Sequence, residues 1–284
     1  MTGKKNCHDS AKLKLQVPGT MKVTMTPSWR SIWVSLVLML GLSPMPVEAR
    51  TLAAIKADGV LRVGLTGDYA PYSLRGPDGT ITGADVTIAQ ALANELGVAL
   101  EIVPTTWKSM AVDLKADRFD IAMGGVSVTA ERAAIGDFSI TIMSDGKRPI
   151  VRCSDKERYV SLASIDQSDV RVVFNPGGTN ETFAKAHFPD AKLEEHADNR
   201  TIFDEITAGH ADVMVTDGAE VDYQALRHQG ALCAASVPDA FNHFDKAYWM
   251  TRDSALKTAV DAVVKKSLDA GDYRRALTAV ASKP

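Results

Sequence analysis

The sequence has few of the residues on which several kinds of protein function depend. Only three cysteines and six histidines occur among 284 residues, and they show none of the close spacings of a metal site. A phosphate-binding P-loop, a dinucleotide fingerprint, a GxSxG elbow and an HExxH motif are all missing. The sequence therefore indicates neither nucleotide-dependent nor zinc-dependent chemistry, and it predicts no cofactor and no bound metal.

The chain also lacks a basic patch. Its formal net charge is −3, but residues 1–49 contain six basic and two acidic residues, so the remainder has 26 basic against 33 acidic residues and a net charge of −7. An acidic body of this kind argues against nucleic acid as a partner. With 45% hydrophobic residues, the chain can nevertheless bury a substantial core.

Long apolar runs are absent as well, and the N-terminal one is short. Within residues 1–49, Lys22 and Arg30 precede an apolar stretch over 32–42, and small residues follow up to Ala49. This order predicts a secretory signal cleaved near Ala49 and a periplasmic protein with no stable membrane anchor. A short N-terminal anchor is the alternative, although the stretch falls below the roughly 18 apolar residues of a spanning helix.

Two cysteines remain after the predicted cleavage, Cys153 and Cys233. An exported protein meets an oxidising compartment, so we expect these two thiols to form a disulfide. Metal binding is the weaker alternative because no clustered histidine accompanies them.

Hydrophobic periodicity predicts alternating strands and helices. Alternating or continuous apolar residues predict strands over 61–65, 100–103 and 119–123, with helices over 88–96 and around 110–114 between them. Such an order is typical of βαβ units and of an α/β fold with mainly parallel sheets.

The pattern restarts near residue 170, which favours a second lobe. Strands are predicted over 170–174 and 211–215, helices over 181–188 and 202–208, and a terminal amphipathic helix over 254–280. Ligands of such folds bind at the carboxyl ends of the strands.

Several segments resemble known proteins. Two resemble amino-acid solute-binding proteins: Val63–Tyr72 and Gly124–Arg132. Three others resemble the periplasmic cyclohexadienyl dehydratases, an enzyme family within that superfamily: Asn175–Glu181, Thr216–Glu220 and Lys246–Tyr248. The resemblance covers nearly all of residues 51–280. It implies a two-lobed periplasmic-binding-protein-like fold with the ligand cleft between the lobes.

This fold implies a chain that crosses twice between lobes. We expect a signal peptide region over 1–49, the first segment of lobe 1 over 50–148 and lobe 2 over 149–243. Residues 244–284 should return to lobe 1 and end in the C-terminal helix.

The resemblance also implies a reaction and its partners. The activity is a carbon–oxygen lyase reaction of phenylalanine biosynthesis, in which prephenate or arogenate loses CO2 and water and its ring becomes aromatic. Aromatisation drives this step, so no cofactor is required. The expected partners are these small molecules, and a homo-oligomer is possible.

Binding of the substrate carboxylates is expected from two places. Arg132, with Ser127 nearby, matches the arginine that grips the ligand carboxylate in the relatives, and a guanidinium can do so with two hydrogen bonds. The turn Asn175–Asn180 places backbone N–H groups at a helix start, with Gly178 allowing close approach and Thr179 able to cap. The alternatives are a surface arginine and an ordinary capped turn.

Glu220 is the expected general acid, and the resemblance adds Lys246 and Asn175 to the catalytic group. To donate a proton near neutral pH, Glu220 needs a raised pKa, which burial and a nearby anion would supply. Lys246 is expected to neutralise the ring carboxylate or to pair with Glu220. The alternatives are a solvated first-turn glutamate and a solvated hinge lysine.

Four further residues complete the expected substrate site. Asp217 corresponds to the carboxylate that binds the ligand ammonium in the relatives, and Asp68 lies in a ligand-contacting loop; either one is also a candidate to orient Glu220 or to cap a turn. Trp107 and Tyr72 are expected to wall the ring, although aromatic residues in such folds are often core.

Two rival functions share this fold. One is a periplasmic receptor that delivers a polar amino acid to an ABC transporter, and the other is an extracellular sensor lobe. Glu220 together with Asn175 and Asn180 favours the enzyme, and the lack of a signalling domain after residue 284 disfavours the sensor.

Overall fold

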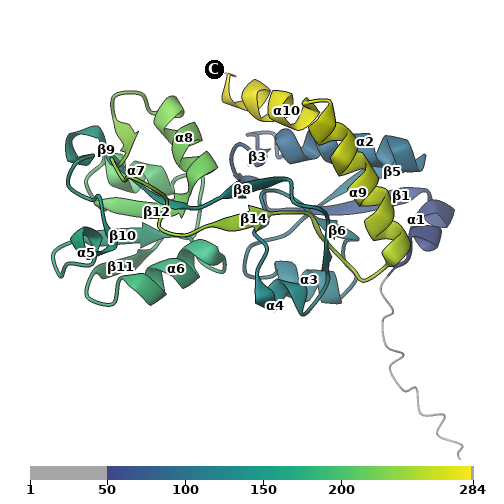
Figure 1. Ribbon diagram of the computed structural model, residues 1–284, viewed down its shortest axis with the longest axis horizontal. Coiled ribbons are helices and arrows are strands. Elements are labelled where there is room, and N and C mark those ends of the chain that lie inside the picture. Colours follow the sequence, from purple (N-terminus) through teal and green to yellow (C-terminus); the bar gives the residue numbers. More distant parts are fainter. Residues whose placement is uncertain (1–49, 283–284) are drawn as a thin grey trace, which may run out of the picture. The chain divides into compact units, whose positions relative to one another are not determined.

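Two five-stranded sheets organise the chain, and each has its own hydrophobic core. The structure is a computed structural model that describes residues 50–282 (Figure 1). The predicted signal over residues 1–49, with its cleavage site near Ala49, lies outside the described residues and stays a prediction.

The first sheet has the order β5-β1-β6-β15-β7. Strand β1 pairs in parallel with β5 and β6, whereas β15 runs antiparallel to β6 and β7. Its strands are β1 (Val60–Leu65), β5 (Ala99–Pro104), β6 (Ile121–Ala122), β7 (Asp137–Phe138) and β15 (Trp249–Met250). The helices of this lobe are α1 (Leu52–Asp58), α2 (Ala84–Leu96), α3 (Met110–Lys115), α4 (Ala130–Ala133) and α9 (Ser254–Asp269). A small sheet lies beside them: β2 (Asp68–Tyr69), β3 (Ser73–Arg75) and β4 (Ile81–Thr82).

The alternation of β1 explains how this lobe forms. Leu61, Val63 and Leu65 are fully buried, and they pack with apolar residues of α2 and α9 in one cluster. Trp249 and residues of α3 form a second cluster. The sheet is therefore covered on both faces, as a parallel α/β sheet must be.

The second sheet has the order β11-β10-β12-β9-β13. Its strands are β9 (Lys147–Arg152), β10 (Arg171–Phe174), β11 (Lys192–Glu195), β12 (Val213–Asp217) and β13 (Leu232–Ala234). Its helices are η1 (Cys153–Asp155), α5 (Leu162–Ile165), α6 (Thr179–His187), α7 (Ile202–Thr207) and α8 (Gly218–Arg227). Val172 and Phe174 of β10 pack in one cluster and Val173 in another, as expected for side chains that alternate across a sheet.

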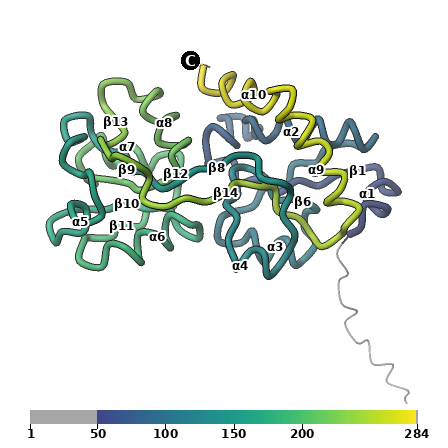
Figure 2. The backbone as a smooth tube through the Cα atoms, in the orientation of Figure 1, coloured from purple at the N-terminus to yellow at the C-terminus, as the bar shows by residue number. Residues whose placement is uncertain are grey.

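The chain crosses between the two sheets twice. Strands β8 (Met143–Asp145) and β14 (Phe244–Lys246) pair antiparallel and run side by side between the lobes (Figure 2). The predicted boundary between 148 and 149 falls inside β9, and the boundary at 243–244 falls at the start of β14. The assignment of the three segments to two lobes remains our interpretation.

The C-terminal segment differs from the single helix predicted over 254–280. It forms two helices, α9 and α10 (Asp272–Ala281), and the chain turns between them at Gly271, which has φ +72°. This left-handed backbone is readily adopted by glycine and ends a helix. The apolar periodicity continues across the break, so it does not reveal the change of direction.

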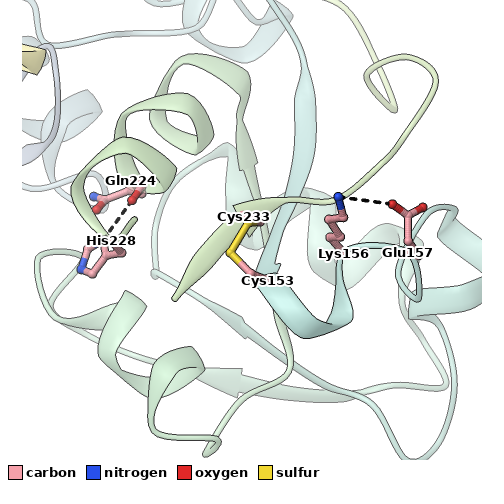
Figure 3. Close-up of a disulfide and its surroundings, with 6 residues drawn as sticks. All are labelled: Cys153, Lys156, Glu157, Gln224, His228 and Cys233. Carbon is pink, nitrogen blue, oxygen red and sulfur yellow. Dashed lines mark hydrogen bonds and ion pairs between the residues drawn. A yellow bond between two sulfur atoms is a disulfide. The ribbon is translucent and has the colours of Figure 1, made fainter. Parts of the chain in front are cut away.

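A disulfide joins Cys153 to Cys233 within the second lobe (Figure 3). Cys233 lies in β13 and pairs with Val151 of β9, two residues before Cys153. The bond therefore ties the end of β9 and the following turn to the edge strand β13, next to the helix that carries Gln224 and His228.

No helix in residues 50–282 combines the length and apolar character that crossing a membrane requires.

Candidate functional site

A polar cavity lies between the two lobes. It is lined from the first lobe by Tyr69, Trp107, Gly125, Ser127 and Arg132. The second lobe contributes Asn175, Gly178, Thr179, Asn180 and Asp217. Several of these residues follow the carboxyl ends of β6, β10 and β12, where ligands of open α/β sheets bind.

Arg132 enters the cavity from the short helix α4. Thr129 caps this helix by accepting a hydrogen bond from the Arg132 backbone N–H, and the Arg132 guanidinium donates to the Ser127 carbonyl over 2.8 Å. Burial lowers the pKa of Arg132, and no carboxylate among the described residues forms a salt bridge with it. A buried guanidinium without an anionic partner can bind a ligand carboxylate.

Lys147 and Lys246 hold Asp217 between them. The Lys147 Nζ donates to Asp217 Oδ1 over 2.5 Å, Lys246 Nζ donates to Oδ2, and the Tyr69 hydroxyl donates to Oδ2 as well. All three charged side chains are almost completely buried. The two ammonium groups keep the pKa of Asp217 well below its usual range, although burial alone would raise it.

This arrangement bears on two expectations from the sequence, which stay predictions. Asp217 was expected to bind a ligand ammonium, but both of its oxygens already accept hydrogen bonds from the protein. Lys246 was expected to neutralise a ring carboxylate or to pair with Glu220; its ion pair is with Asp217, and it also donates to the Gly125 carbonyl over 2.7 Å. The aromatic rings of Tyr69, Tyr72 and Phe244 surround its ammonium group.

The turn before α6 forms one wall of the cavity. Gly177 has φ +85°, and a Cβ there would lie 2.5 Å from the backbone nitrogen of Lys108 in the other lobe. Gly178 is the N-cap of α6, and no side chain caps the helix, so the predicted capping role of Thr179 is wrong. The Thr179 hydroxyl instead accepts a hydrogen bond from Lys147 over 3.0 Å. The first N–H groups of α6 have no partner in their own helix and are available to an anion.

Asn180 connects this turn to the buried interior. Its Nδ2 donates to Asn175 Oδ1 over 2.9 Å and to Thr216 Oγ1 over 3.0 Å, while its Oδ1 accepts from Lys147. Asn175 and Asn180 are both nearly fully buried, and both line the cavity.

Glu220 lies behind Asn180, in the first turn of α8. Thr216 Oγ1 donates to Glu220 Oε2 over 2.6 Å, and Asn199 Nδ2 donates to Glu220 Oε1 over 3.0 Å. The side chain is completely buried and forms no salt bridge with any described residue. Burial raises the pKa of Glu220 to about 8, the negative charge of Asp217 adds to this, and the two hydrogen bonds oppose it. Glu220 is therefore protonated at neutral pH. Its carboxyl does not line the cavity. Asn180, which does, donates a hydrogen bond to Thr216, and Thr216 donates one to Glu220.

The aromatic residues divide between wall and core. Trp107 lines the cavity and donates from Nε1 to Asp68 Oδ1 over 3.1 Å. Tyr72, expected to wall the ring, is completely buried and packs behind Gly125, where a Cβ would lie 2.5 Å from its ring. Tyr69 takes that place at the cavity, and its ring stacks on Tyr72. Asp68 does not line the cavity, and burial raises its pKa.

Four residues of the site were not predicted. Tyr69 stands within a segment that resembles the solute-binding proteins, so that resemblance could have found it. Lys147 begins strand β9, which also contains Arg148 and Arg152, so its charge alone does not mark it as a buried cation. Thr216 begins the segment Thr216–Glu220 that resembles the dehydratases, so that resemblance could have found it. Asn199 carries no sequence signal, because only the fold brings it to Glu220.

A family model describes most of the chain. The model of bacterial extracellular solute-binding proteins, family 3, matches residues 61–279. The chain belongs to this family. Because the family consists of extracellular proteins, membership indicates an exported protein. The predicted α/β, two-lobed fold with a cleft between the lobes is confirmed.

Individual relatives narrow the comparison. A cyclohexadienyl dehydratase from Pseudomonas aeruginosa is 45% identical over 226 residues, which cover 80% of this chain and 84% of the relative. The crystal structure of an ancestral amino acid-binding protein, a precursor of cyclohexadienyl dehydratase, superposes with a TM-score of 0.72 at 34% identity, covering 80% of this chain and 97% of the other. The predicted resemblance to the dehydratases is thus confirmed.

Relatives that bind amino acids are similar too. An amino acid transporter substrate-binding protein from Streptococcus pneumoniae, bound to L-arginine, has a TM-score of 0.75 at 31% identity and covers 81% of this chain and 97% of its own. The fold alone therefore does not separate an enzyme from a transport receptor.

Proposed function

We propose that this protein is an exported dehydratase that aromatises prephenate to phenylpyruvate, arogenate to phenylalanine, or both, without a cofactor. In this reaction the bond between the ring carbon and its carboxylate carbon breaks and releases CO2. The electron pair moves through the ring and expels the hydroxyl on the opposite carbon. Glu220 supplies the proton with which that hydroxyl leaves as water, and the resulting carboxylate regains a proton from solvent.

The observation that carries this proposal is the complete burial of the Glu220 carboxyl, with no cation paired to it among the described residues. A general acid at neutral pH must keep its proton until the substrate takes it, and a pKa of about 8 meets that need. Asp217, three positions earlier, is ionised between two lysines. Neighbouring carboxyls held in opposite protonation states are typical of acid–base active sites.

The charges around the cavity suit a dianion. Arg132 lines the cavity without a salt-bridge partner among the described residues, and Lys147 and Lys246 share the carboxylate of Asp217. We assign one substrate carboxylate to Arg132. The other belongs to the N-terminus of α6, with Asn175, Gly178, Thr179 and Asn180 around it.

A transport receptor for a polar amino acid is the rival function, and the state of Asp217 disfavours it. A receptor needs a free carboxylate for the ligand ammonium, whereas Asp217 already binds two ammonium groups and a tyrosine hydroxyl. Glu220 would also have no purpose in such a receptor.

The deciding experiment is an assay of the purified protein with prephenate, in which phenylpyruvate is followed by its absorbance in alkali. We expect turnover by the wild type, and a fall in kcat of about 10²-fold or more for Glu220→Gln, which keeps the shape but has no acidic proton. As a matched control, Glu95→Gln changes an exposed glutamate of α2 that pairs with Lys266 and should leave kcat within about twofold. Tight binding of an amino acid without any turnover would contradict the proposal and favour the receptor.

A further inference from the structure

Asn199 connects Glu220 to the opposite lobe. It lies between β11 and α7 in the second lobe and is 1% exposed. Its Nδ2 donates to the backbone carbonyl of Asp68 over 2.9 Å and to Glu220 Oε1 over 3.0 Å. Asp68 lies in β2 of the first lobe, 131 positions away in the sequence. One amide group therefore joins the proposed acid to the other side of the cleft.

The two hydrogen bonds to Glu220 differ in what they depend on. Thr216 ends up beside Glu220 because β12 leads directly into α8, so that bond exists within the second lobe alone. Asn199 uses one N–H for Glu220 and the other for Asp68, and its own Oδ1 has no partner among the described residues. Because its two donated bonds are its only described polar contacts, the amide is held in place by the lobes together. Without Asp68, it is free to turn away from Glu220.

We infer that Asn199 is a positioning residue that aims the Glu220 carboxyl when the two lobes are together. This inference rests on the proposed function, since it assigns a role to a partner of the proposed acid. With one oxygen held by Thr216 and the other by Asn199, the carboxyl plane is fixed. When the first lobe withdraws, the carbonyl of Asp68 leaves with it and the acid loses one of its two supports.

The inference predicts that Asn199 acts on the acid and on the contact between lobes, whereas Thr216 acts on the acid alone. Asn199→Ala should lower kcat for prephenate about tenfold or more, with KM changed less than about threefold, because a positioning residue acts mainly on the chemical step. It should also increase the radius of gyration of the ligand-free protein in X-ray scattering. Thr216→Val should lower kcat but leave the radius of gyration unchanged.

The pH dependence separates positioning from a general loss of stability. A hydrogen bond donated to a carboxylate lowers its pKa, so losing either donor should move the alkaline limb of the kcat profile to higher pH. The other groups that face Glu220 are Asp68, Tyr69, Tyr72, Lys147 and Asp217, and both variants retain them. Asn94→Ala, which changes an exposed asparagine of α2, is the control and should alter none of these readouts.

The outcome can be read even if the proposed function fails. Titration of the Glu220 carboxyl by carbon-13 NMR needs no turnover, and Asn199→Ala should raise its pKa relative to the wild type. The inference is overturned if Asn199→Ala leaves this titration and the kcat profile unchanged, or if Thr216→Val expands the protein as much. A wild type that does not turn over prephenate, but whose Glu220 titration and dimensions respond to Asn199→Ala, would instead sink the proposed function and keep the link between the lobes.

Discussion

The carboxyls of Asp217 and Glu220 are three positions apart in the sequence, yet one is ionised and the other is neutral. Asp217 is buried with two lysines and is ionised; Glu220 is buried with a threonine and an asparagine and is protonated. Desolvation opposes ionisation in both, so the nearby cations decide the difference. The sequence predicted a raised pKa for Glu220 from its proposed role, but Lys147, which fixes the state of Asp217, was not predicted.

The protonation of Glu220 should be visible in stability, independently of activity. Its pKa is 4.5 in an unfolded chain and about 8 in the folded protein, so between these values the folded state retains a proton that the unfolded state has lost. The free energy of unfolding of the wild type should therefore fall as pH rises through this window, by up to about 1.4 kcal/mol for each pH unit from this group. Glu220→Gln has no such proton.

We thus expect Glu220→Gln to gain stability relative to the wild type as the pH is raised from 5 to 8. Urea unfolding of both proteins at several pH values measures the difference. A difference that stays constant across this range would mean that Glu220 is not protonated in the folded protein.

Arg132 allows a test of carboxylate binding. Arg132→Ala should raise KM for prephenate by about tenfold or more, since a charge-assisted bidentate contact is lost. Arg132→Lys keeps the charge but not the planar fork, so we expect an intermediate KM. We would compare KM for prephenate between the wild type and both variants by steady-state kinetics, and use circular dichroism to verify that the variants fold. Unchanged KM in Arg132→Ala would remove Arg132 from the proposed site.

The lysine pair on Asp217 predicts which substrate is preferred. Prephenate has a keto group where arogenate has an ammonium, and an ammonium entering beside Asp217 meets Lys147 and Lys246. We expect kcat/KM to be about tenfold or more higher for prephenate, because like charges at short range repel strongly in a buried site. Lys147→Met frees Asp217 Oδ1 and should narrow this ratio. Equal kcat/KM values for both substrates in the wild type would contradict the argument.

Among the elements, the start of α6 gives the sharpest test of packing across the cleft. Gly177 has φ +85° and faces the Lys108 backbone of the other lobe, whereas Gly178 has φ −113° and faces Trp107 at an ordinary contact distance of 3.6 Å. Gly177→Ala should therefore keep the lobes apart and weaken product binding by about tenfold or more, with a loss of stability of ~1–2 kcal/mol from backbone strain. Gly178→Ala is the matched control and should leave the stability unchanged. Calorimetric titration with phenylpyruvate and thermal unfolding distinguish the two.

The disulfide belongs to the second lobe and should affect its stability. Cys153 and Cys233 are separated by 80 positions, so the bond restricts a long segment of the unfolded chain. The double variant Cys153→Ser/Cys233→Ser should lose ~2–4 kcal/mol of unfolding free energy. Its kcat should be unchanged, because the bond lies outside the cavity. An unchanged melting temperature on reduction of the wild type would show that the bond contributes little.

Regular elements were the most predictable part of the fold. The apolar alternation at 61–65 and the helical spacing at 88–96 both correspond to observed elements, because these residues face a core in a simple period. The strand predicted over 119–123 shortens to β6, Ile121–Ala122, where pairing partners exist. The break between α9 and α10 was not predicted, because the apolar residues keep a helical spacing on both sides of the turn where the chain changes direction.

For the molecule as a whole, predictability depends on distance along the chain. Arg132, Asn175, Asn180 and Asp217 were predicted by resemblance, and all four line the cavity. Asn199 was not, because its importance depends on Glu220 and Asp68, which only the folded chain brings to it. The same holds for Tyr72, whose place behind Gly125 follows from a close approach between segments that the sequence does not reveal.

Lys147 and Lys246 stand at the ends of the two connecting strands, one just after β8 and the other closing β14. Bending these connectors should shift the ammonium group of Lys246, which bridges to Ser127, relative to Asp217, whereas Lys147 pairs directly with Asp217 in the second sheet and keeps its place. We expect a doubly charged ligand in the cavity to attract the ammonium group at the end of β14, and dissolved salt to weaken this attraction. The distance between Lys246 and Asp217 therefore depends on the hinge, whereas the distance between Lys147 and Asp217 does not.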